Sequence, residues 1–395
     1  MSDRNEQLIS SQLFIFLILR KASQIRVCRD DDMDMMFVED CCQILDSMRV
    51  PITASDREEG EYPYYGANGI QDYVADYIFD DELVLLAEDG GNFGSKERPI
   101  AYRVSGKCWV NNHAHVLKPK DGLDVDYLCY SLMFYKVDGM VNGATRQKLT
   151  QAAMRKMQIP SRSMDEQKYI VDELNRIIRI KEQRQQELQL LDDLIKARFV
   201  EMFVDRDYPL IALDELSLGK GEYGAQSASI DYNSSRPRYV RITDINDDGT
   251  LNDDLVSSAN VEDDKQYKLS YGDFMFARMG ATVGKAYAYK SGNQIFAGYL
   301  IRYRLNLEKI MPEYLYAYTK LDEYRNWVLL NQSGAAQPGI NAKKYGSLRV
   351  PVAPLKEQKA FVKFVNQVDK SKVAVQKALT ETQLLFDSLM QQYFG

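Results

Sequence analysis

Two stretches of the sequence, "SRSMDEQKYIVDEL" at residues 161–174 and "APLKEQKAFVKFV" at 353–365, open in the same way. Laying one over the other at a constant offset of 191 residues extends the match upstream without a gap, as far as Gly143 facing Gly334. Before that point, "LVLLAEDGGNFG" at 83–94 resembles "DFMFARMGATVG" at 273–284. A repeat this long reflects architecture. It predicts two copies of one mixed unit, in which short strands and turns precede a Gly-rich loop and one long helix.

Length and composition agree with two globular domains, because 395 residues can form two cores and 45% of them are hydrophobic. The apolar run "LFIFLIL" at 13–19 is about a third of the length that spans a bilayer. The residues before it lack the basic character of a secretory signal. Five cysteines lie in the first third without metal-site spacing, which favours free thiols in a reducing compartment. We therefore expect a cytoplasmic chain with no membrane partner.

The repeated stretches begin two heptad helices. Ser163 followed by Glu166 is a possible capping box. Apolar residues then recur with 4-3 spacing, at Ile170, Leu174, Ile177, Leu188, Leu191 and Ile195 in the first helix and at Phe361, Val365, Val368, Val375, Leu379, Phe386 and Leu389 in the second. Lys181 and Lys372 occupy equivalent polar positions in these stripes, and we expect them to set the register of helix pairing.

A helix of about 38 residues is about 57 Å long and cannot bury such a stripe by itself. One interpretation is that each helix packs as an ordinary core helix on its own domain. The other is that the two stripes pack on each other as an antiparallel coiled coil. The second interpretation predicts an α+β fold, with two pseudo-symmetric mixed domains joined and spaced by two long antiparallel helices.

No catalytic motif accompanies the repeat. "GATVGK" at 280–285 is one residue too short between its glycines for a P-loop and lacks the following Ser or Thr. "HAH" at 113–115 holds both histidines of the chain, on one face if the segment is a strand, but no third metal ligand is evident. We expect neither a metal site nor a catalytic residue. Duplicated architecture without a duplicated catalytic set indicates a recognition protein.

Three kinds of loop could carry out the recognition. They are the Tyr-rich "YPYYGANG" at 62–69, the two loops before the long helices at 142–150 and 332–341, and the strip from 278 to 285. Their side chains are of the kinds that read base edges and hold phosphates. The candidate DNA-binding residues are Tyr64, Tyr65, Asn68, Arg146, Gln147, Lys148, Arg278, Thr282, Lys285, Gln332, Gln337 and Asn341. For any one of them, a plain turn residue on a solvated surface is an equally good interpretation.

The net charge of −7 argues against a generally basic surface for nucleic acid. The charge is unevenly distributed, since residues 208–352 carry 17 basic and 17 acidic side chains, whereas 37–164 have an acidic excess of five. We expect any DNA affinity of the chain alone to be modest and to need a basic partner.

These motifs resemble the specificity subunits of type I restriction-modification systems. The resemblance rests on "YPYYGANGIQDYV", on "LLAEDG" with "FARMG", and on the prolines and "EQ" pairs that open both long helices. It covers about residues 38–395, and residues 1–36 stand outside it as an atypical N-terminal extension. It implies target recognition domains at 37–160 and 207–351, with spacer helices at 161–206 and 352–395.

The resemblance also implies the function. Each recognition domain would read one half of a split, asymmetric site in double-stranded DNA. The helices would dock two modification subunits, which bind S-adenosylmethionine, and restriction subunits that use ATP and Mg would complete the complex. This chain itself would bind no cofactor. Two alternatives remain open at this stage: a scaffold whose repeated domains bind a protein or a glycan, and an enzyme whose site escapes motif analysis.

Overall fold

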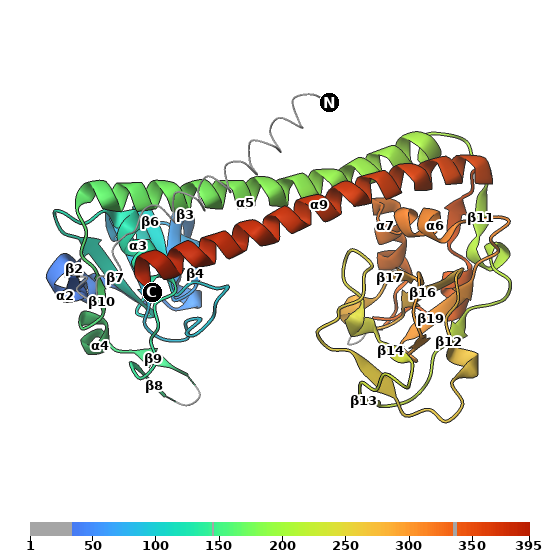
Figure 1. Ribbon diagram of the computed structural model, residues 1–395, viewed down its shortest axis with the longest axis horizontal. Helices are drawn as coiled ribbons and strands as arrows, with labels where there is room; N and C mark the ends of the chain where they lie inside the picture. The colour runs from blue at the N-terminus through green and yellow to red at the C-terminus, as the bar shows by residue number, and fades with distance from the viewer. Residues whose placement is uncertain (1–33, 144–145, 335–337) are drawn as a thin grey trace. The chain divides into compact units, whose positions relative to one another are not determined.

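The computed structural model describes residues 34–143, 146–334 and 338–395. They form two compact units: unit 1 contains the described residues up to 181 together with 381–395, and unit 2 contains residues 182–380. Each unit includes part of both long helices, α5 (Met164–Phe199) and α9 (Leu355–Phe394), as Figure 1 shows. The extension expected at 1–36 lies outside the described residues except for its end. Met35 and Met36 belong to a strand of unit 1, so that boundary was placed too late.

Unit 1 is built on a six-stranded sheet with the order β2-β7-β5-β6-β3-β4. The strands are β1 (Met35–Phe37), β2 (Cys42–Ile44), β3 (Glu59–Gly66), β4 (Gly69–Val74), β5 (Phe79–Ala87), β6 (Ala101–Val110), β7 (Ala114–Pro119), β8 (Val141–Asn142), β9 (Lys148–Leu149) and β10 (Gln158–Pro160). The short helices are α2 (Val38–Cys41), α3 (Val125–Met133) and α4 (Gln151–Arg155).

Strand β5 shows why this sheet is apolar on both sides. Successive side chains of a strand point to opposite faces. Val84 and Leu86 pack in the core that includes α3 and the long helices, whereas Leu83 and Leu85 pack in a second core on the other face. The sequence of this strand therefore contains a continuous run of hydrophobic residues, at 83–87.

Unit 2 contains a four-stranded sheet with the order β12-β19-β16-β17. Its strands are β11 (Leu210–Ala212), β12 (Glu222–Tyr223), β13 (Ser229–Asp231), β14 (Arg238–Val240), β15 (Ser257–Ala259), β16 (Asp273–Ala277), β17 (Ala286–Ala288), β18 (Gln294–Phe296), β19 (Leu300–Arg304) and β20 (Arg349–Pro351). Its short helices are α6 (Pro312–Tyr318), α7 (Asp322–Asn331) and α8 (Ala342–Gly346).

The two units share a set of equivalent elements, as the sequence predicts. β5 pairs with β6 and β7 in unit 1, and β16 pairs with β17 and β19 in unit 2, all antiparallel. The pairs β1 with β10 and β11 with β20 lead into the two long helices. Helix α4 is capped by Thr150, and α8 is capped by Asn341 at the equivalent position. Helix α7 is a feature of unit 2 for which the described part of unit 1 has no equivalent.

The long helices pair antiparallel within each unit. In unit 1, Arg162 donates to the Tyr393 carbonyl oxygen, and Lys181 Nζ lies 5.1 Å from the Phe386 ring centroid. In unit 2, the Phe199 and Phe361 rings are 5.4 Å apart. Lys372 Nζ there lies 2.7 Å from Asp192 Oδ1, an ion pair across the two helices. These contacts place both lysines at the helix pair, and their role in setting its register stays a prediction.

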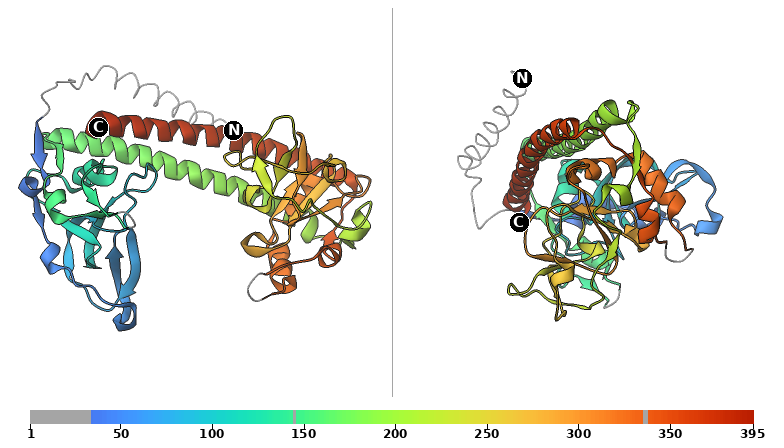
Figure 2. Two further views of the ribbon diagram at one scale, coloured as in Figure 1. Left: turned by 90° about the horizontal axis from the view of Figure 1, so that it is seen from below. Right: turned by 90° about the vertical axis from the view of Figure 1, so that its right-hand side faces the viewer.

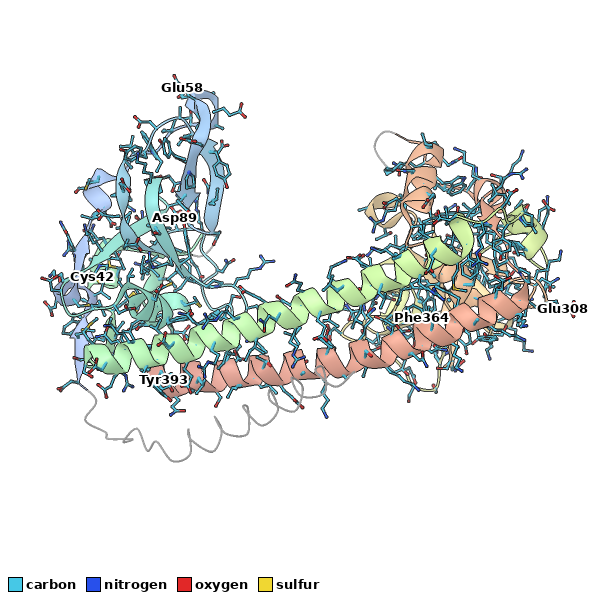
Figure 3. All side chains as sticks on the ribbon, turned by 90° about the horizontal axis from the view of Figure 1, so that it is seen from above. Cys42, Glu58, Asp89, Glu308, Phe364 and Tyr393 are labelled. Carbon is cyan, nitrogen blue, oxygen red and sulfur yellow. The ribbon has the colours of Figure 1, made fainter. Side chains whose placement is uncertain are left out.

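The residues of the predicted stripes are all buried or half-buried. Ile170, Leu174, Ile177, Phe361, Val368, Val375, Phe386 and Leu389 are buried, whereas Leu188, Leu191, Ile195, Val365 and Leu379 are half-buried. Figure 3 labels Tyr393 near the end of α9 in unit 1, where its hydroxyl donates to Glu173 on α5. Ser163 and Glu166 form the expected reciprocal cap, because Ser163 N donates to Glu166 Oε2 at 2.9 Å.

One glutamine in each unit ties the long helix to its domain. Gln167 and Gln358 are both 0% exposed. Gln358 Oε1 accepts from the Met311 amide at 2.9 Å, and its Nε2 donates to the Lys309 and Ala353 carbonyls. Gln167 makes the same three bonds in unit 1, to Asp124 N, Gly122 O and Arg162 O. These are the glutamines of the two "EQ" pairs.

Four of the five cysteines lie in the described part of the chain. Cys41, Cys42, Cys108 and Cys129 are buried and free, and burial raises the pKa of Cys108 and Cys129 to about 12. Cys28 lies outside the described residues. None of the helices that the structure describes is long and apolar enough to cross a membrane.

Candidate functional site

The same turn follows the equivalent strands β5 and β16. In unit 1, Glu88 N donates to His113 O at 2.8 Å and Glu88 O accepts from Leu149 N at 2.7 Å. In unit 2, Arg278 N donates to Tyr299 O at 3.0 Å and Arg278 O accepts from Ile340 N at 2.9 Å. Glu88 and Arg278 therefore occupy the same backbone position in the two units.

A glycine two residues further on completes each turn. Gly90 has φ of 63° and donates its amide to Gln147 O, whereas Gly280 has φ of 71° and donates to Pro338 O. A side chain is rarely tolerated at such φ, which accounts for glycine at both places. The turn after the strand and the loop before the long helix are thus joined in each unit, although these segments lie far apart in the sequence.

In unit 1 this framework gathers most of the predicted residues. Asn68 Nδ2 donates to Gly90 O at 3.0 Å, and Asn68 Oδ1 accepts from Asn92 at 3.1 Å. Arg146 pairs with Asp89 at 2.8 Å, and Lys148 pairs with Glu88 at 2.9 Å. Arg146 and Lys148 still expose 60% and 50% of their side chains. Figure 1 shows the β8–β9 segment at the side of unit 1 opposite α5, and Figure 3 labels Asp89.

The remaining predicted residues of unit 1 differ in exposure. Gln147 is exposed, and Tyr65 is half-buried with its ring 5.8 Å from that of Tyr102. Burial raises the pKa of Tyr65. Tyr64 is 1% exposed, its ring lies under the Arg57 guanidinium, and its hydroxyl bonds to the backbone of Ile52. The prediction of Tyr64 as a DNA-binding residue is therefore wrong, because neither its ring nor its hydroxyl is available to a ligand.

The sequence predicts both histidines on one face of a strand, and the structure differs from that expectation. His113 lies in the turn before β7, with Nδ1 2.6 Å from Asp89 Oδ1. His115 lies in β7, is fully buried, and contacts Asp46 Oδ2 at 2.7 Å through Nδ1 and Leu149 O at 2.9 Å through Nε2. Both ring nitrogens thus face acceptors. The ring is therefore held at both ends, by the Asp46 carboxylate and by the backbone of Leu149.

Asp46, Glu88 and His115 place potential metal-ligand atoms within 4.8 Å of one another, which the sequence did not reveal because Asp46 is remote from the histidines. Each carboxylate already has protein donors. Arg49 and Lys148 contact Glu88, while Val116 N and Gln151 donate to Asp46. Both carboxylates of this cluster are therefore engaged by protein donors.

Hydrogen bonding controls the ionisation of both acids in this network. Burial alone would raise the pKa of Asp46, but the bonds from His115, Val116 and Gln151 outweigh it and leave that pKa below its ordinary value. Burial likewise opposes the bonds from Arg49 and Lys148 to Glu88, whose pKa is also lowered. The network anchors β9 at Leu149 and thereby the loop that carries Arg146 and Lys148.

In unit 2 the predicted residues divide into two groups. Arg278, Asn341 and Gln332 flank the turn after β16 and the loop before α8, and Gln337 lies outside the described residues. The side chain of Asn341 accepts from Lys344 N, so it caps α8. Lys285 pairs with Asp247 at 2.7 Å, and Thr282 Oγ1 donates to Met279 O. These last three side chains have structural partners, which leaves Arg278 and the half-buried Gln332 among the described residues of this set.

Sequence reasoning missed two aromatic residues of unit 2 and the ion partners of unit 1. Tyr223 and Tyr299 approach Arg278 from β12 and from the turn before β19. Glu88, Asp89 and His113 hold the basic residues of unit 1. The alignment of "LLAEDG" with "FARMG" contained a usable signal, because it places Glu88 opposite Arg278.

A family model described as the type I restriction modification DNA specificity domain matches residues 30–190 and 220–383. The chain therefore belongs to this family of type I restriction-modification specificity subunits, and it is a non-catalytic member of such systems. The repeated match agrees with the two units of the fold.

Individual relatives agree with this assignment. The chain is 27% identical over 355 residues to S.HindORF215P of Haemophilus influenzae, named as a type I restriction enzyme specificity subunit; the match covers 84% of this chain and 86% of the relative. It is 22% identical to the StySPI specificity subunit of Salmonella potsdam, over 79% of this chain and 74% of that one.

Two solved structures are similar in fold. The S subunit of the type I system from M. genitalium has a TM-score of 0.54 at 14% identity, covering 94% of this chain and 98% of that one. A chain from a study of complex assembly and conformational transition in the type I R-M system has a TM-score of 0.55 at 14% identity, covering 91% and 97%. Figure 2 gives two further views of the arrangement within each unit.

Proposed function

We propose that this chain reads a bipartite, asymmetric site in double-stranded DNA, with one half-site contacted by each unit. The observation that carries the proposal is the pair of equivalent turns after β5 and β16. They share a backbone framework but present different side chains, Glu88 with basic neighbours in one unit and Arg278 in the other. A common framework with different side chains suits the recognition of two different sequences.

The acidic balance of the first half is compatible with DNA binding by unit 1. Glu88 and Asp89 are engaged by Arg49, Lys148 and Arg146, so these two acids do not face the solvent as unpaired charges. The exposed side chains at this turn are those of the arginine and the lysine of the loop. Phosphate contacts of such residues position a protein on the duplex, whereas contacts with base edges specify the sequence.

In the same proposal, the long helices dock two modification subunits, which bind S-adenosylmethionine and methylate adenine in each half-site. Restriction subunits join the complex and use ATP with Mg. Support for docking comes from large apolar side chains on the outer faces of the helices. Leu190 and Leu194 on α5 expose 60% and 47% in unit 2, and Leu384 on α9 exposes 64% in unit 1. Adjacent exposed apolar side chains are typical of interaction surfaces, and Leu190 and Leu194 lie one helical turn apart.

The test is single-molecule methylome sequencing of a host that carries this chain with its modification subunit, compared with a host that lacks only this chain. A split asymmetric motif with N6-methyladenine in both halves, dependent on the chain, is the expected result. If an active modification subunit gives no motif that depends on the chain, the proposal fails and an interaction scaffold becomes the better account.

The exposed basic residues of unit 1 are expected to contribute to the affinity of the complex for DNA. In the complex with modification subunits, Arg146→Ala and Lys148→Ala are each expected to weaken binding about equally for all DNA sequences. Each should reduce the slope of log affinity against log salt by about 1, because each loses about one phosphate contact. Salt titrations of fluorescence anisotropy measure both effects. Lys136→Ala, at an exposed lysine after α3, is the control, and an unchanged slope in both loop variants would contradict the prediction.

The docking surface carries a second prediction. Leu190 and Leu194 are one helical turn apart, so Leu190→Glu with Leu194→Glu places two charges on one exposed face. We expect the double variant to keep the thermal stability of the wild type and to lose co-purification with the modification subunit. Gln185→Glu adds a charge at another exposed position of α5 and should retain the subunit. Retention by the double variant would exclude this face from docking.

A further inference from the structure

Arg278 lies beside two exposed aromatic rings. Its guanidinium carbon is 4.9 Å from the ring centroid of Tyr223 and 5.9 Å from that of Tyr299. These tyrosines expose 42% and 55% of their surface, so they are surface residues and not part of a core. Cation–π attraction restricts the orientation of a guanidinium held in this way.

The guanidinium has no hydrogen-bonded partner in the described parts of the chain, and its Nε is buried without one. Arg302, in the neighbouring strand β19, shows the contrast. It is 1% exposed, and its nitrogens donate to Glu222, Lys268 O and Gln266 O. Buried donors are almost always satisfied in native proteins, and an unsatisfied one costs free energy. An oriented arginine with unused donors is suited to an acceptor supplied by a ligand.

The position of Arg278 points to the same ligand as the proposed function. The residue directly follows β16, and its backbone bonds to Tyr299 and Ile340 fix the start of the side chain. Unit 1 has Glu88 at this position, where Arg49 and Lys148 engage its carboxylate. The two units therefore place different groups at the same point of the fold, a carboxylate engaged by protein cations in unit 1 and an arginine in unit 2.

We propose that Arg278 reads a guanine in the half-site bound by unit 2, by donating from its guanidinium to guanine O6 and N7. This inference rests on the proposed function. Two parallel donors on a planar fork match the two acceptors on the major-groove edge of guanine, and this is the commonest specific contact of arginine. Tyr223 and Tyr299 are positioning residues that hold the fork in its plane. Unit 1 has Glu88 and not an arginine at the equivalent position, so this contact is proposed for unit 2 alone.

The test compares methylomes made with wild-type chain, Arg278→Gln and Arg349→Gln, each with the modification subunit. Arg349 is an exposed arginine on β20 and serves as the matched control. We expect Arg278→Gln to lose the requirement for one guanine in one half of the motif, while the other half stays unchanged. In competition binding, discrimination at that base pair should fall about 10- to 100-fold. The retained half-site shows that the variant is folded and assembled.

The tyrosine variants separate positioning from a general structural role. Tyr299→Phe keeps a ring beside the guanidinium and should preserve the motif, whereas Tyr299→Ala should weaken discrimination at the same base pair as Arg278→Gln. An unchanged motif with Arg278→Gln overturns the inference and leaves the proposed function standing. A loss of affinity equal for all bases also overturns it, since that result identifies a phosphate contact. If the wild type yields no chain-dependent motif, both proposals fail together.

Discussion

Gln358→Leu is expected to lower the free energy of unfolding of unit 2 by about 3 kcal/mol or more. The substitution removes one acceptor and two donors from a site that is 0% exposed, and it leaves the Met311 amide and the Lys309 and Ala353 carbonyls without their partner. Each buried polar group left unsatisfied costs about 1–3 kcal/mol. Leucine has a similar size but can satisfy none of them.

The measurement is urea unfolding combined with hydrogen exchange, because a chain of two units need not unfold in one step. Exchange should accelerate at the Met311 amide, which begins α6, more than in unit 1. Gln367→Leu, at an exposed position of α9, is the control and should change stability by no more than about 0.5 kcal/mol. Gln167→Leu should produce the same effect in unit 1, at the Asp124 amide. Equal stability of the Gln358 and Gln367 variants would show that the Gln358 hydrogen bonds do not stabilise the attachment of α9 to its domain.

Asp46→Ala is expected to lower the free energy of unfolding of unit 1 by about 3–5 kcal/mol, since it leaves His115, Val116 N and Gln151 without the buried carboxylate to which they bond, and each buried polar group left unsatisfied costs about 1–3 kcal/mol. The side chains of Asp46 and His115 are 3% and 0% exposed. Asp46→Asn should cost less, because the asparagine side chain keeps an oxygen for Val116 N and an amide group beside His115 Nδ1. Urea unfolding of both variants measures the difference. Asp80→Asn, at an exposed position of β5, is the control.

The pH dependence of stability distinguishes these variants further. The pKa of Asp46 is lower in the folded chain than its ordinary value of 3.8. Its carboxylate therefore contributes stability above about pH 4, and that contribution is lost as the pH falls through the folded pKa. The wild type should lose stability on acidification below about pH 4 more steeply than Asp46→Asn. Identical slopes for these two proteins would show that Asp46 contributes nothing to acid sensitivity.

The same substitution should affect the recognition loop. His115 bonds to Leu149 O and Gln151 bonds to Asp46, so the network holds β9 and the start of α4. Faster hydrogen exchange at residues 148–151 in Asp46→Ala is expected alongside the loss of stability. Protection equal to that of the wild type would mean that the loop is held by its backbone bonds alone.

The sequence by itself determined the features that depend on local pattern or on repetition. The heptad stripes predicted the buried sides of α5 and α9, and Ser163 with Glu166 predicted the helix start, because capping and amphipathic periodicity act within a few residues. The offset of 191 residues predicted the duplication of units. The absence of catalytic motifs, together with the repeated prolines and "EQ" pairs, indicated a non-catalytic specificity subunit.

Only the tertiary structure decided the roles that depend on long-range partners. Tyr64 resembled an exposed ligand-binding tyrosine, but its hydroxyl is used by Ile52 and its ring is covered. Gln167 and Gln358 could be recognised in the sequence as repeated residues. The backbone groups with which they bond, however, lie 5 to 49 residues away. Arg278 stood out from other cations only once Tyr223 and Tyr299 were brought beside it. Periodicity reports which face a residue occupies, whereas burial and hydrogen-bond partners depend on which distant segments the fold brings to that face.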